Sequence, residues 1–193
     1  MPALIYFMTT NQQVVSRTDE DRAEQPHTGD HRINEIPQTH ERSIAKIAPP
    51  ISGGCACSAI RYESAAEPVI MLHCHCRDCQ QSSGGPFSSF VIVPAETFKL
   101  LKGSPRFHAS PSEAGGLTRR GFCPECGVPI VVKPDAAPQF VAIRTASLDD
   151  PSWFNPQMDV WTSDAHPWDQ MNPMLPKFEK YPPSGDSADP AAA

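Results

Sequence analysis

The chain has 193 residues, a net charge of −6 and an isoelectric point near 5.6. Its length suits one domain with a hydrophobic core, and its acidic balance argues against the non-specific nucleic-acid binding that clustered lysine and arginine side chains support. No apolar run approaches the roughly 20 residues of a membrane-spanning helix, and the first residues do not resemble a signal peptide. We therefore expect a cytoplasmic protein that binds neither nucleic acid nor membrane.

Residues 1–50 are predicted to form a disordered or extended arm. Residues 9–48 are polar and of mixed charge, and their isolated aliphatic side chains follow no sustained period. Such a segment buries too little apolar area to offset the cost of ordering its backbone, about 1–2 kcal/mol per residue. The last residues, 183–193, are predicted to be a disordered tail.

The folded domain is predicted to span residues 51–182 and to be all-β. Short runs of β-branched and aromatic residues are separated by turn residues, and no window carries an apolar stripe at helical spacing. Residues 164–182 are expected to form an irregular segment whose apolar side chains fill gaps over the sheet. The expected strands cover residues 59–62, 68–72, 87–93, 106–108, 128–132, 140–145 and 159–161.

Seven cysteines lie in three tight clusters and predict a zinc protein. C-x-C and C-x-x-C spacings set two thiolates at the separation that a tetrahedral zinc with bonds of about 2.3 Å requires. A disulfide framework needs an even number of cysteines and an oxidising compartment, and a thioredoxin-like pair needs an alternating βα pattern that the sequence lacks. The clusters are Cys55-Ala56-Cys57, Cys74-His75-Cys76-Arg77-Asp78-Cys79 and Cys123-Pro124-Glu125-Cys126-Gly127.

Local geometry separates ligands from their neighbours. Residues two apart in a strand point the same way, so the cysteines of each C-x-C pair share a face. His73 and His75 then face away from the thiolates and are expected to pack rather than to bind metal. In the third cluster Pro124 fixes φ after one thiolate and Gly127 permits a positive φ after the next, as a tight zinc turn requires.

We expect the seven cysteines to divide between two zinc ions, four on one and three on the other. A closed structural zinc takes four cysteines, and a zinc with an open position takes three. The length of chain between cysteines does not decide which four bind one zinc. Closing a loop about four times longer costs only about 1.2 kcal/mol, whereas a structural zinc contributes about 10–16 kcal/mol. Cys74, Cys76 and Cys79 can cap one ion locally, but spacing alone leaves the partition open.

Longer stretches around the cysteines carry a family resemblance. They are residues 53–62, 74–80, 84–87, 93–94, 120–127, 147–151 and 168–182. Together they resemble the glutathione-dependent formaldehyde-activating enzyme family from about Gly53 to Pro182, in order and with every cysteine used. One departure is Ser58, where the family usually has glycine.

The resemblance implies a tent-like all-β fold that is stapled by zinc. It also implies two zinc ions per chain and settles the partition. The ligands would be Cys55, Cys57, Cys123 and Cys126 for a structural zinc, and Cys74, Cys76 and Cys79 for a second, open zinc.

A zinc held by three thiolates favours sulfur as its next ligand and deprotonates a bound thiol. A thiolate made at neutral pH is a competent nucleophile. The resemblance implies the addition of glutathione to formaldehyde by an enzyme classed as a carbon-sulfur lyase. The predicted partners are therefore a small thiol such as glutathione and a small carbonyl compound.

The alternative is a non-catalytic scaffold, because the family resembled here also includes centromere protein V, a chromatin and cytoskeleton associated protein. A basic N-terminal arm would favour that alternative, but the arm has more acidic than basic residues. No catalytic acid or base is assigned. His75 and Arg77 lie beside the second site in the sequence, and Arg119, Arg120 and Arg144 are equally available anchors for an acidic thiol.

Overall fold

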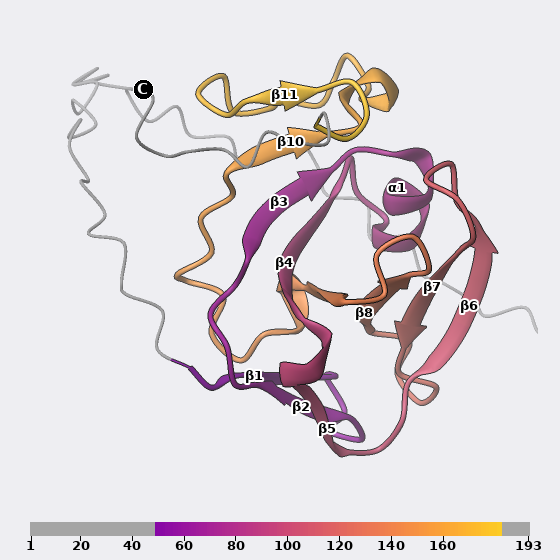
Figure 1. The fold of residues 1–193 in the computed structure, drawn as a ribbon, viewed down its shortest axis with the longest axis vertical. Helices are drawn as coiled ribbons and strands as arrows, with labels where there is room; N and C mark the ends of the chain where they lie inside the picture. Colours follow the sequence, from indigo (N-terminus) through magenta and orange to yellow (C-terminus); the bar gives the residue numbers. More distant parts are fainter. Residues whose placement is uncertain (1–48, 183–193) are drawn as a thin grey trace, which may run out of the picture. The chain divides into compact units, whose positions relative to one another are not determined.

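A computed structural model of the protein describes residues 49–182. The predicted arm at residues 1–50 and the tail at 183–193 fall almost wholly outside the described residues, so both stay predictions. Figure 1 shows the elements, which in chain order are β1 (Ile51–Gly54), β2 (Arg61–Ser64), β3 (Ile70–Cys74), α1 (Arg77–Ser83), β4 (Ser88–Pro94), η1 (Ala95–Thr97), β5 (Phe98–Lys102), β6 (Arg106–Pro111), β7 (Leu117–Phe122), β8 (Pro129–Pro134), β9 (Phe140–Arg144), η2 (Thr145–Ser147), β10 (Met158–Val160), η3 (Thr162–Asp164) and β11 (Lys177–Phe178).

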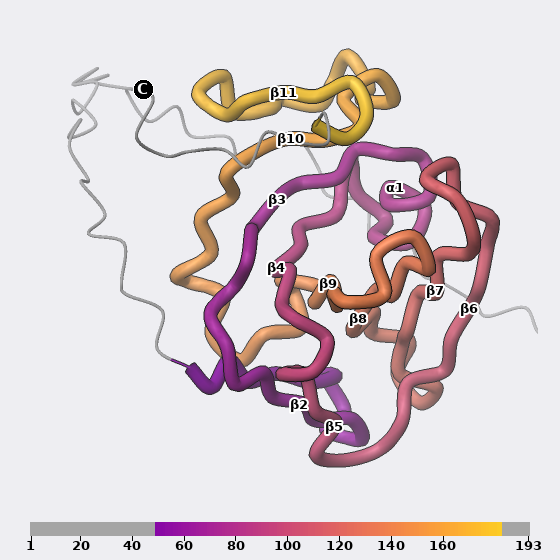
Figure 2. Tube along the Cα trace, in the orientation of Figure 1, coloured from indigo at the N-terminus to yellow at the C-terminus, as the bar shows by residue number. Residues whose placement is uncertain are grey.

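The strands form two sheets. The smaller sheet has the strand order β1-β2-β5, and the larger has the order β11-β10-β3-β4-β9-β8-β7-β6. In the larger sheet β10 runs parallel to both of its neighbours, β3 and β11, while the remaining neighbours pair antiparallel. Figures 1 and 2 show this sheet curving, with β3 and β4 on one side and β6 and β7 on the other.

The central strand β4 is apolar on both of its faces. Val91 and Val93 are fully buried in the core that also contains the smaller sheet. Phe90 and Ile92 alternate with them and belong to a second apolar cluster on the opposite face. Because successive side chains of a strand point to opposite sides, the near-continuous apolar run of β4 reflects two different environments.

The all-β prediction is confirmed, with the short helix α1 and three single-turn 3-10 helices as additions. α1 escaped the sequence analysis because its seven residues are too few to display an amphipathic period. It begins after Cys76 and ends at Gly84, whose φ of 73° provides the left-handed cap that glycine adopts most readily. The Gln80 side chain donates to the carbonyl of His75 over 2.7 Å and fixes the helix to the preceding turn.

Strands β1, β5, β7 and β11 were also not expected. β5 and β7 carry lysine and arginine and have only one largely buried residue between them, Gly121, so their composition resembles that of a solvated loop. They are strands because β5 pairs with β2, and β7 pairs with both β6 and β8.

The C-terminal segment is partly as expected. Leu175 and Phe178 are half-buried, and Phe178 packs against the second apolar cluster. For Trp168 the expectation of gap-filling is wrong, because this side chain is 65 % exposed and stacks on His166. Within residues 49–182, no helix is both long and apolar enough to cross a membrane.

Candidate metal centres and the adjoining cavity

Four cysteines meet between the β1–β2 turn and the β7–β8 turn. The sulfur atoms of Cys55, Cys57, Cys123 and Cys126 all lie within 4.8 Å of one another. The Sγ of Cys57 is 3.4 Å from that of Cys55 and 3.7 Å from that of Cys123. A tetrahedral zinc with Zn–S bonds of about 2.3 Å places its sulfur ligands about 3.8 Å apart. The donor set and its spacing therefore fit a closed four-thiolate zinc.

Each of the two turns contains a residue with positive φ. Gly127 has a φ of 74° and donates its N–H to the Cys123 carbonyl over 2.9 Å, which confirms its predicted backbone geometry. Ser58 has a φ of 59° and donates its N–H to the Cys55 carbonyl over 3.0 Å. A residue with a Cβ pays about 1–2 kcal/mol in this region, so Ser58 carries strain that the family's usual glycine avoids.

Hydrogen bonds favour the thiolate form at two members of the four-cysteine group. Burial acts to raise the pKa of Cys55, but the Ile60 N–H, which donates to its Sγ over 3.2 Å, and the neighbouring thiols outweigh burial and lower that pKa to about 6. Backbone hydrogen bonds, first from Val128, also lower the pKa of Cys126. For Cys57 the Ala59 backbone hydrogen bond lowers the pKa, but hydrogen bonds with Cys55 and Cys126 outweigh it and raise that pKa to about 12. The thiolate, which is the form that binds metal, is therefore favoured at Cys55 and Cys126.

Three more cysteines form a second group where β3 passes into α1. Cys74 is the last residue of β3, Cys76 precedes α1 and Cys79 lies within it, and their sulfur atoms lie within 4.8 Å of one another. Hydrogen bonds from the thiols of Cys74 and Cys79 lower the pKa of Cys76. This three-cysteine group fits a zinc that keeps a coordination position for an incoming ligand.

The extended geometry predicted for the C-x-C pairs is wrong. β1 ends before Cys55, and β3 ends at Cys74, so that Cys76 lies in the turn that leads into α1. Turns and not strand alternation therefore bring the sulfur atoms together. The expectation that His73 and His75 pack rather than bind metal agrees with their contacts, although not because of strand alternation. His73 Nδ1 is 2.9 Å from Ser89 Oγ, and neither histidine belongs to a metal-compatible group among the described residues.

His75 is fully buried and links the three-cysteine group to the C-terminal part of the domain. Its Nδ1 lies 2.7 Å from Oδ2 of Asp169, and its Nε2 lies 3.2 Å from Oδ1 of Asp159. Both carboxylates are 2 % exposed. Because His75 lies between Cys74 and Cys76 in the chain, these contacts hold the turn that carries both cysteines.

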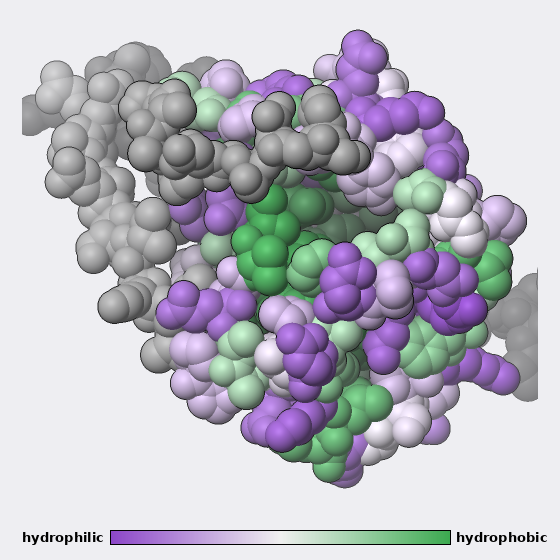
Figure 3. Space-filling model, in the orientation of Figure 1, coloured by the Kyte–Doolittle hydropathy of each residue, from purple (hydrophilic) through white to green (hydrophobic). Residues whose placement is uncertain are grey.

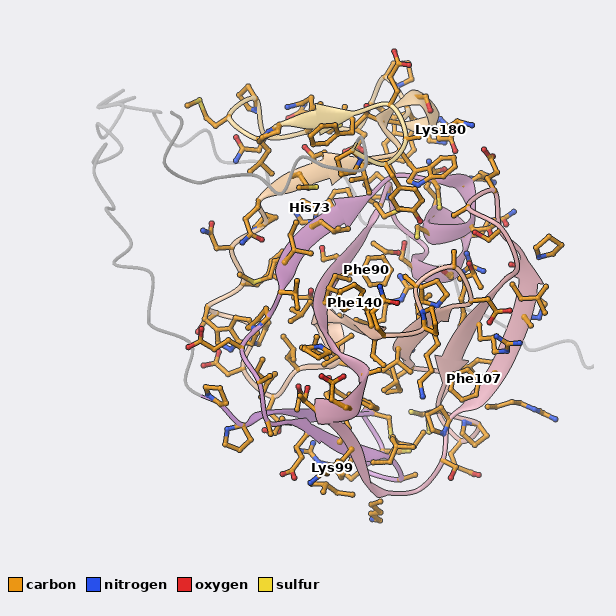
Figure 4. All side chains as sticks on the ribbon, in the orientation of Figure 1. His73, Phe90, Lys99, Phe107, Phe140 and Lys180 are labelled. Carbon is orange, nitrogen blue, oxygen red and sulfur yellow. The ribbon has the colours of Figure 1, made fainter. Side chains whose placement is uncertain are left out.

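A cavity of about 580 Å³ borders the three-cysteine group. All three cysteines of that group contribute to its wall, and none of the other four does. Figure 3 shows the opening as a hollow with hydrophobic residues at its edge. Phe90 and Phe140, labelled in Figure 4, belong to its wall. The remaining apolar wall residues include Leu72, Ile92, Val132, Ala142, Val160 and Trp161.

The sequence model of the family described as glutathione-dependent formaldehyde-activating enzyme matches residues 50–164, which is more than half of the chain. The chain belongs to this family. The match contains every cysteine of both groups. A crystal structure of a Rhodobacter sphaeroides protein is also similar, with a TM-score of 0.42 and 14 % identity, covering 66 % of this chain and 99 % of that one.

In this member of the glutathione-dependent formaldehyde-activating enzyme family, two arginines flank the three-cysteine group. Arg120 lines the cavity, donates to Oδ2 of Asp78 over 2.8 Å, and lowers the pKa of Cys76 after the larger effect of the neighbouring thiols. Arg144 is 5 % exposed and lies with its guanidinium 4.7 Å from the centre of the Phe90 ring. Burial lowers the pKa of Arg144, while the charge of the Cys79 thiolate opposes that shift.

The structure separates arginines that the sequence left equivalent. Arg77 and Arg120 line the cavity, whereas Arg119 pairs with Asp135 and is absent from its wall. Arg120 and Arg119 are neighbours on β7, so their side chains leave the strand on opposite sides. Alternation on a correctly assigned strand would have distinguished them, but the charged sequence of β7 concealed the strand.

Proposed function

We propose that the protein is a zinc-dependent enzyme that forms or breaks a carbon–sulfur bond between a small thiol and a carbonyl compound. One observation carries the proposal: the three-cysteine group, and not the four-cysteine group, forms part of the cavity wall. The group whose ligand number leaves room for a substrate is thus the one that a small molecule can reach. Glutathione and formaldehyde are the substrates named by the family.

Zinc at the three-cysteine group would act as a soft Lewis acid that converts a thiol into a thiolate at neutral pH. In the synthetic direction the sulfur bonds to the carbonyl carbon, the carbon–oxygen π bond breaks, and the oxygen takes up the proton that the thiol lost. In the reverse direction the carbon–sulfur bond breaks and the proton returns to sulfur. Neither direction requires an oxidant or a reductant.

Residues of the chain would bind the zinc and stabilise the charge that develops during the reaction. Cys74, Cys76 and Cys79 supply the ligands, and the buried pair formed by Asp169 and His75 fixes their turn. The guanidinium of Arg120 faces the cavity beside Cys76. It is placed to stabilise the negative charge that develops on the carbonyl oxygen, because fixed charges act most strongly where the surroundings are apolar.

The test is the rate of adduct formation and breakdown from a thiol and formaldehyde, measured by exchange NMR above the uncatalysed background. We expect the zinc-loaded protein to accelerate both, and Cys76→Ser to abolish the acceleration while circular dichroism shows a folded domain. Arg120→Ala should lower the rate about 10²-fold, as removal of one charge-stabilising donor commonly does. Arg119→Ala is the matched control and should leave the rate unchanged. Equal rates for the wild type and Cys76→Ser would contradict the proposal.

If the protein were only a scaffold, the cavity beside the three-cysteine group would have no role. All seven cysteines are free thiols, and a reducing compartment preserves that state. We therefore include a cytoplasmic location in the proposal.

A further inference from the structure

We propose that the thiol substrate carries an apolar body, aromatic or branched alkyl, and that the cavity beside the three-cysteine group binds this body in preference to the charged peptide of glutathione. The inference rests on the proposed function, because it takes sulfur binding at the three-cysteine group as given. Its own evidence is the shape and charge of the cavity wall.

The floor of the cavity is an apolar row that crosses three strands. Ile92 on β4 pairs with Ala142 on β9, and Ala142 pairs in turn with Val132 on β8. All three side chains line the cavity. The small alanine between two larger residues leaves the space that an aromatic or branched group would fill.

The two faces of the same strands differ in burial. Val91, Val93 and Ile143 are each 0 % exposed on the core face. On the cavity face Phe90 and Val132 are 5 % and 8 % exposed, whereas Ile92 and Ala142 between them are only half-buried. Apolar surface that remains in contact with water gains free energy when a ligand covers it. The cavity face is therefore a surface that an apolar ligand would complete.

Aromatic side chains extend the apolar wall. Trp161 and Tyr181 both line the cavity and meet edge to face, with ring centroids 5.5 Å apart. Trp161 has a φ of 60°, a backbone conformation that costs free energy for any residue with a Cβ. Strain of this kind persists only where the surroundings hold a residue in place. The packing around Trp161 therefore holds its indole against the cavity.

The wall offers glutathione no excess of positive charge. Arg77 and Arg120 in the wall, together with Lys180, which pairs with Glu113 over 2.6 Å, balance the three carboxylates of Asp78, Glu113 and Asp164. Arg120 already pairs with Asp78 over 2.8 Å. Glutathione would bring two further carboxylates and one ammonium group to this wall, and a carboxylate that loses water without gaining a cation is strongly disfavoured. A thiol with an uncharged body avoids that penalty.

The experiment compares three probes on the full chain with cobalt in place of zinc, which makes sulfur binding visible as a change in the sulfur-to-cobalt absorption bands. The probes are phenylmethanethiol, glutathione and phenylmethanol, and tryptophan fluorescence of the zinc-loaded protein, where no cobalt band quenches the emission, reports occupancy of the cavity. We expect phenylmethanethiol to bind at least tenfold more tightly than glutathione and to shift the bands. Phenylmethanol should bind more weakly than phenylmethanethiol and leave the bands unchanged.

Two variants test the wall itself. Ala142→Phe fills the hollow and should weaken phenylmethanethiol binding at least tenfold. Glu113→Lys replaces an exposed acidic side chain of the wall and releases Lys180 from its ion pair with Glu113, so it adds positive charge without repacking the core. It should strengthen glutathione binding several-fold and leave phenylmethanethiol binding unchanged, whereas Glu96→Lys, an exposed change outside the cavity wall, should alter neither.

The outcomes separate this inference from the proposed function. If glutathione shifts the bands at the same concentration as phenylmethanethiol or a lower one, the apolar-body inference is wrong and the proposed function stands. If no thiol shifts the bands of the three-cysteine group, the proposed function is wrong as well. If phenylmethanol binds as tightly as phenylmethanethiol, the cavity does not select for a thiol, and the inference is again wrong.

Discussion

The two cysteine groups use the same side chain in opposite settings. The four-cysteine group joins turns that are far apart in the chain, as Cys57 and Cys123 show with their separation of 66 residues, and two of its members, Cys55 and Cys123, pack in the main core. The three-cysteine group comes from one strand–helix junction and borders a cavity. The comparison teaches that a metal bound by the four-cysteine group would act as a cross-link between distant turns, whereas a metal bound by the three-cysteine group would lie open to a ligand in the cavity.

The largest expected difference is in the free energy of unfolding, when one cysteine is replaced in each group. Cys123→Ser should abolish cooperative unfolding, because a structural zinc contributes about 10–16 kcal/mol and a domain is commonly stable by only about 5–15 kcal/mol. Cys76→Ser, the matched change in the other group, should leave a folded domain. Circular dichroism melts of both variants give the ranking. The reverse ranking would mean that the roles of the two groups have to be exchanged.

Metal removal should separate the groups next. Protein purified without chelator should contain about two zinc ions per chain, and a mild chelator should extract one of them much faster. A three-thiolate zinc offers the chelator a position to attack, and a closed four-thiolate zinc does not. Zinc release followed with a colorimetric indicator measures this. A single zinc, or two released at one rate, would contradict the difference between the groups.

Asp169→Asn should act on one group and spare the other. The change weakens the contact to His75, whose Nδ1 lies 2.7 Å from the carboxylate, and should cost about 1–3 kcal/mol of stability. Because His75 holds the turn between two ligands, we expect the three-cysteine group to lose metal affinity by about 10–100-fold, as changes just outside a metal's ligands commonly do.

Metal titration monitored by cobalt absorption resolves the two groups. The exposed Asp150→Asn serves as the control. An equal loss of affinity at the four-cysteine group would show that Asp169 supports the whole fold and not one turn.

The smallest effect concerns the turns of the four-cysteine group. Ser58→Gly should raise the free energy of unfolding by about 1 kcal/mol, because glycine adopts a positive φ without the Cβ clash. Gly127→Ser is the reciprocal change, since a Cβ there meets nothing within 4 Å and only the φ of 74° opposes it. It should lower stability by a similar amount in urea titrations. Effects of the same sign would rule out backbone strain as their cause.

Short-range patterns in the sequence predicted the parts of the protein that depend on nearby residues. Cysteine spacing predicted metal-compatible groups, and apolar runs predicted strands such as β3, β4 and β9, because both signals lie within a few residues. The polar strands β5 and β7 were missed because their pairing with other strands, β2 for β5 and both β6 and β8 for β7, and not their own composition, makes them strands.

Features that depend on distant residues could not be predicted. His75 meets Asp159 and Asp169 across 84 and 94 residues of chain, and no local spacing indicates such contacts. The cavity likewise arises from the curvature of a sheet, because its wall residues come from β3, β4, β6, β7, β8, β9 and β10. The family resemblance predicted the fold, and belonging to the family is confirmed, but the resemblance did not indicate the apolar character of the wall.

The alternation along β4 and β9 has a consequence for how such proteins diversify. Phe90, Ile92 and Ala142 line the cavity, while Val91 and Ile143 pack in the core. Adjacent residues therefore meet different environments, and a substitution at one position can reshape the cavity while its neighbour keeps the core packed. The cavity wall can thus be altered at alternate positions of two strands without changing any of the seven cysteines.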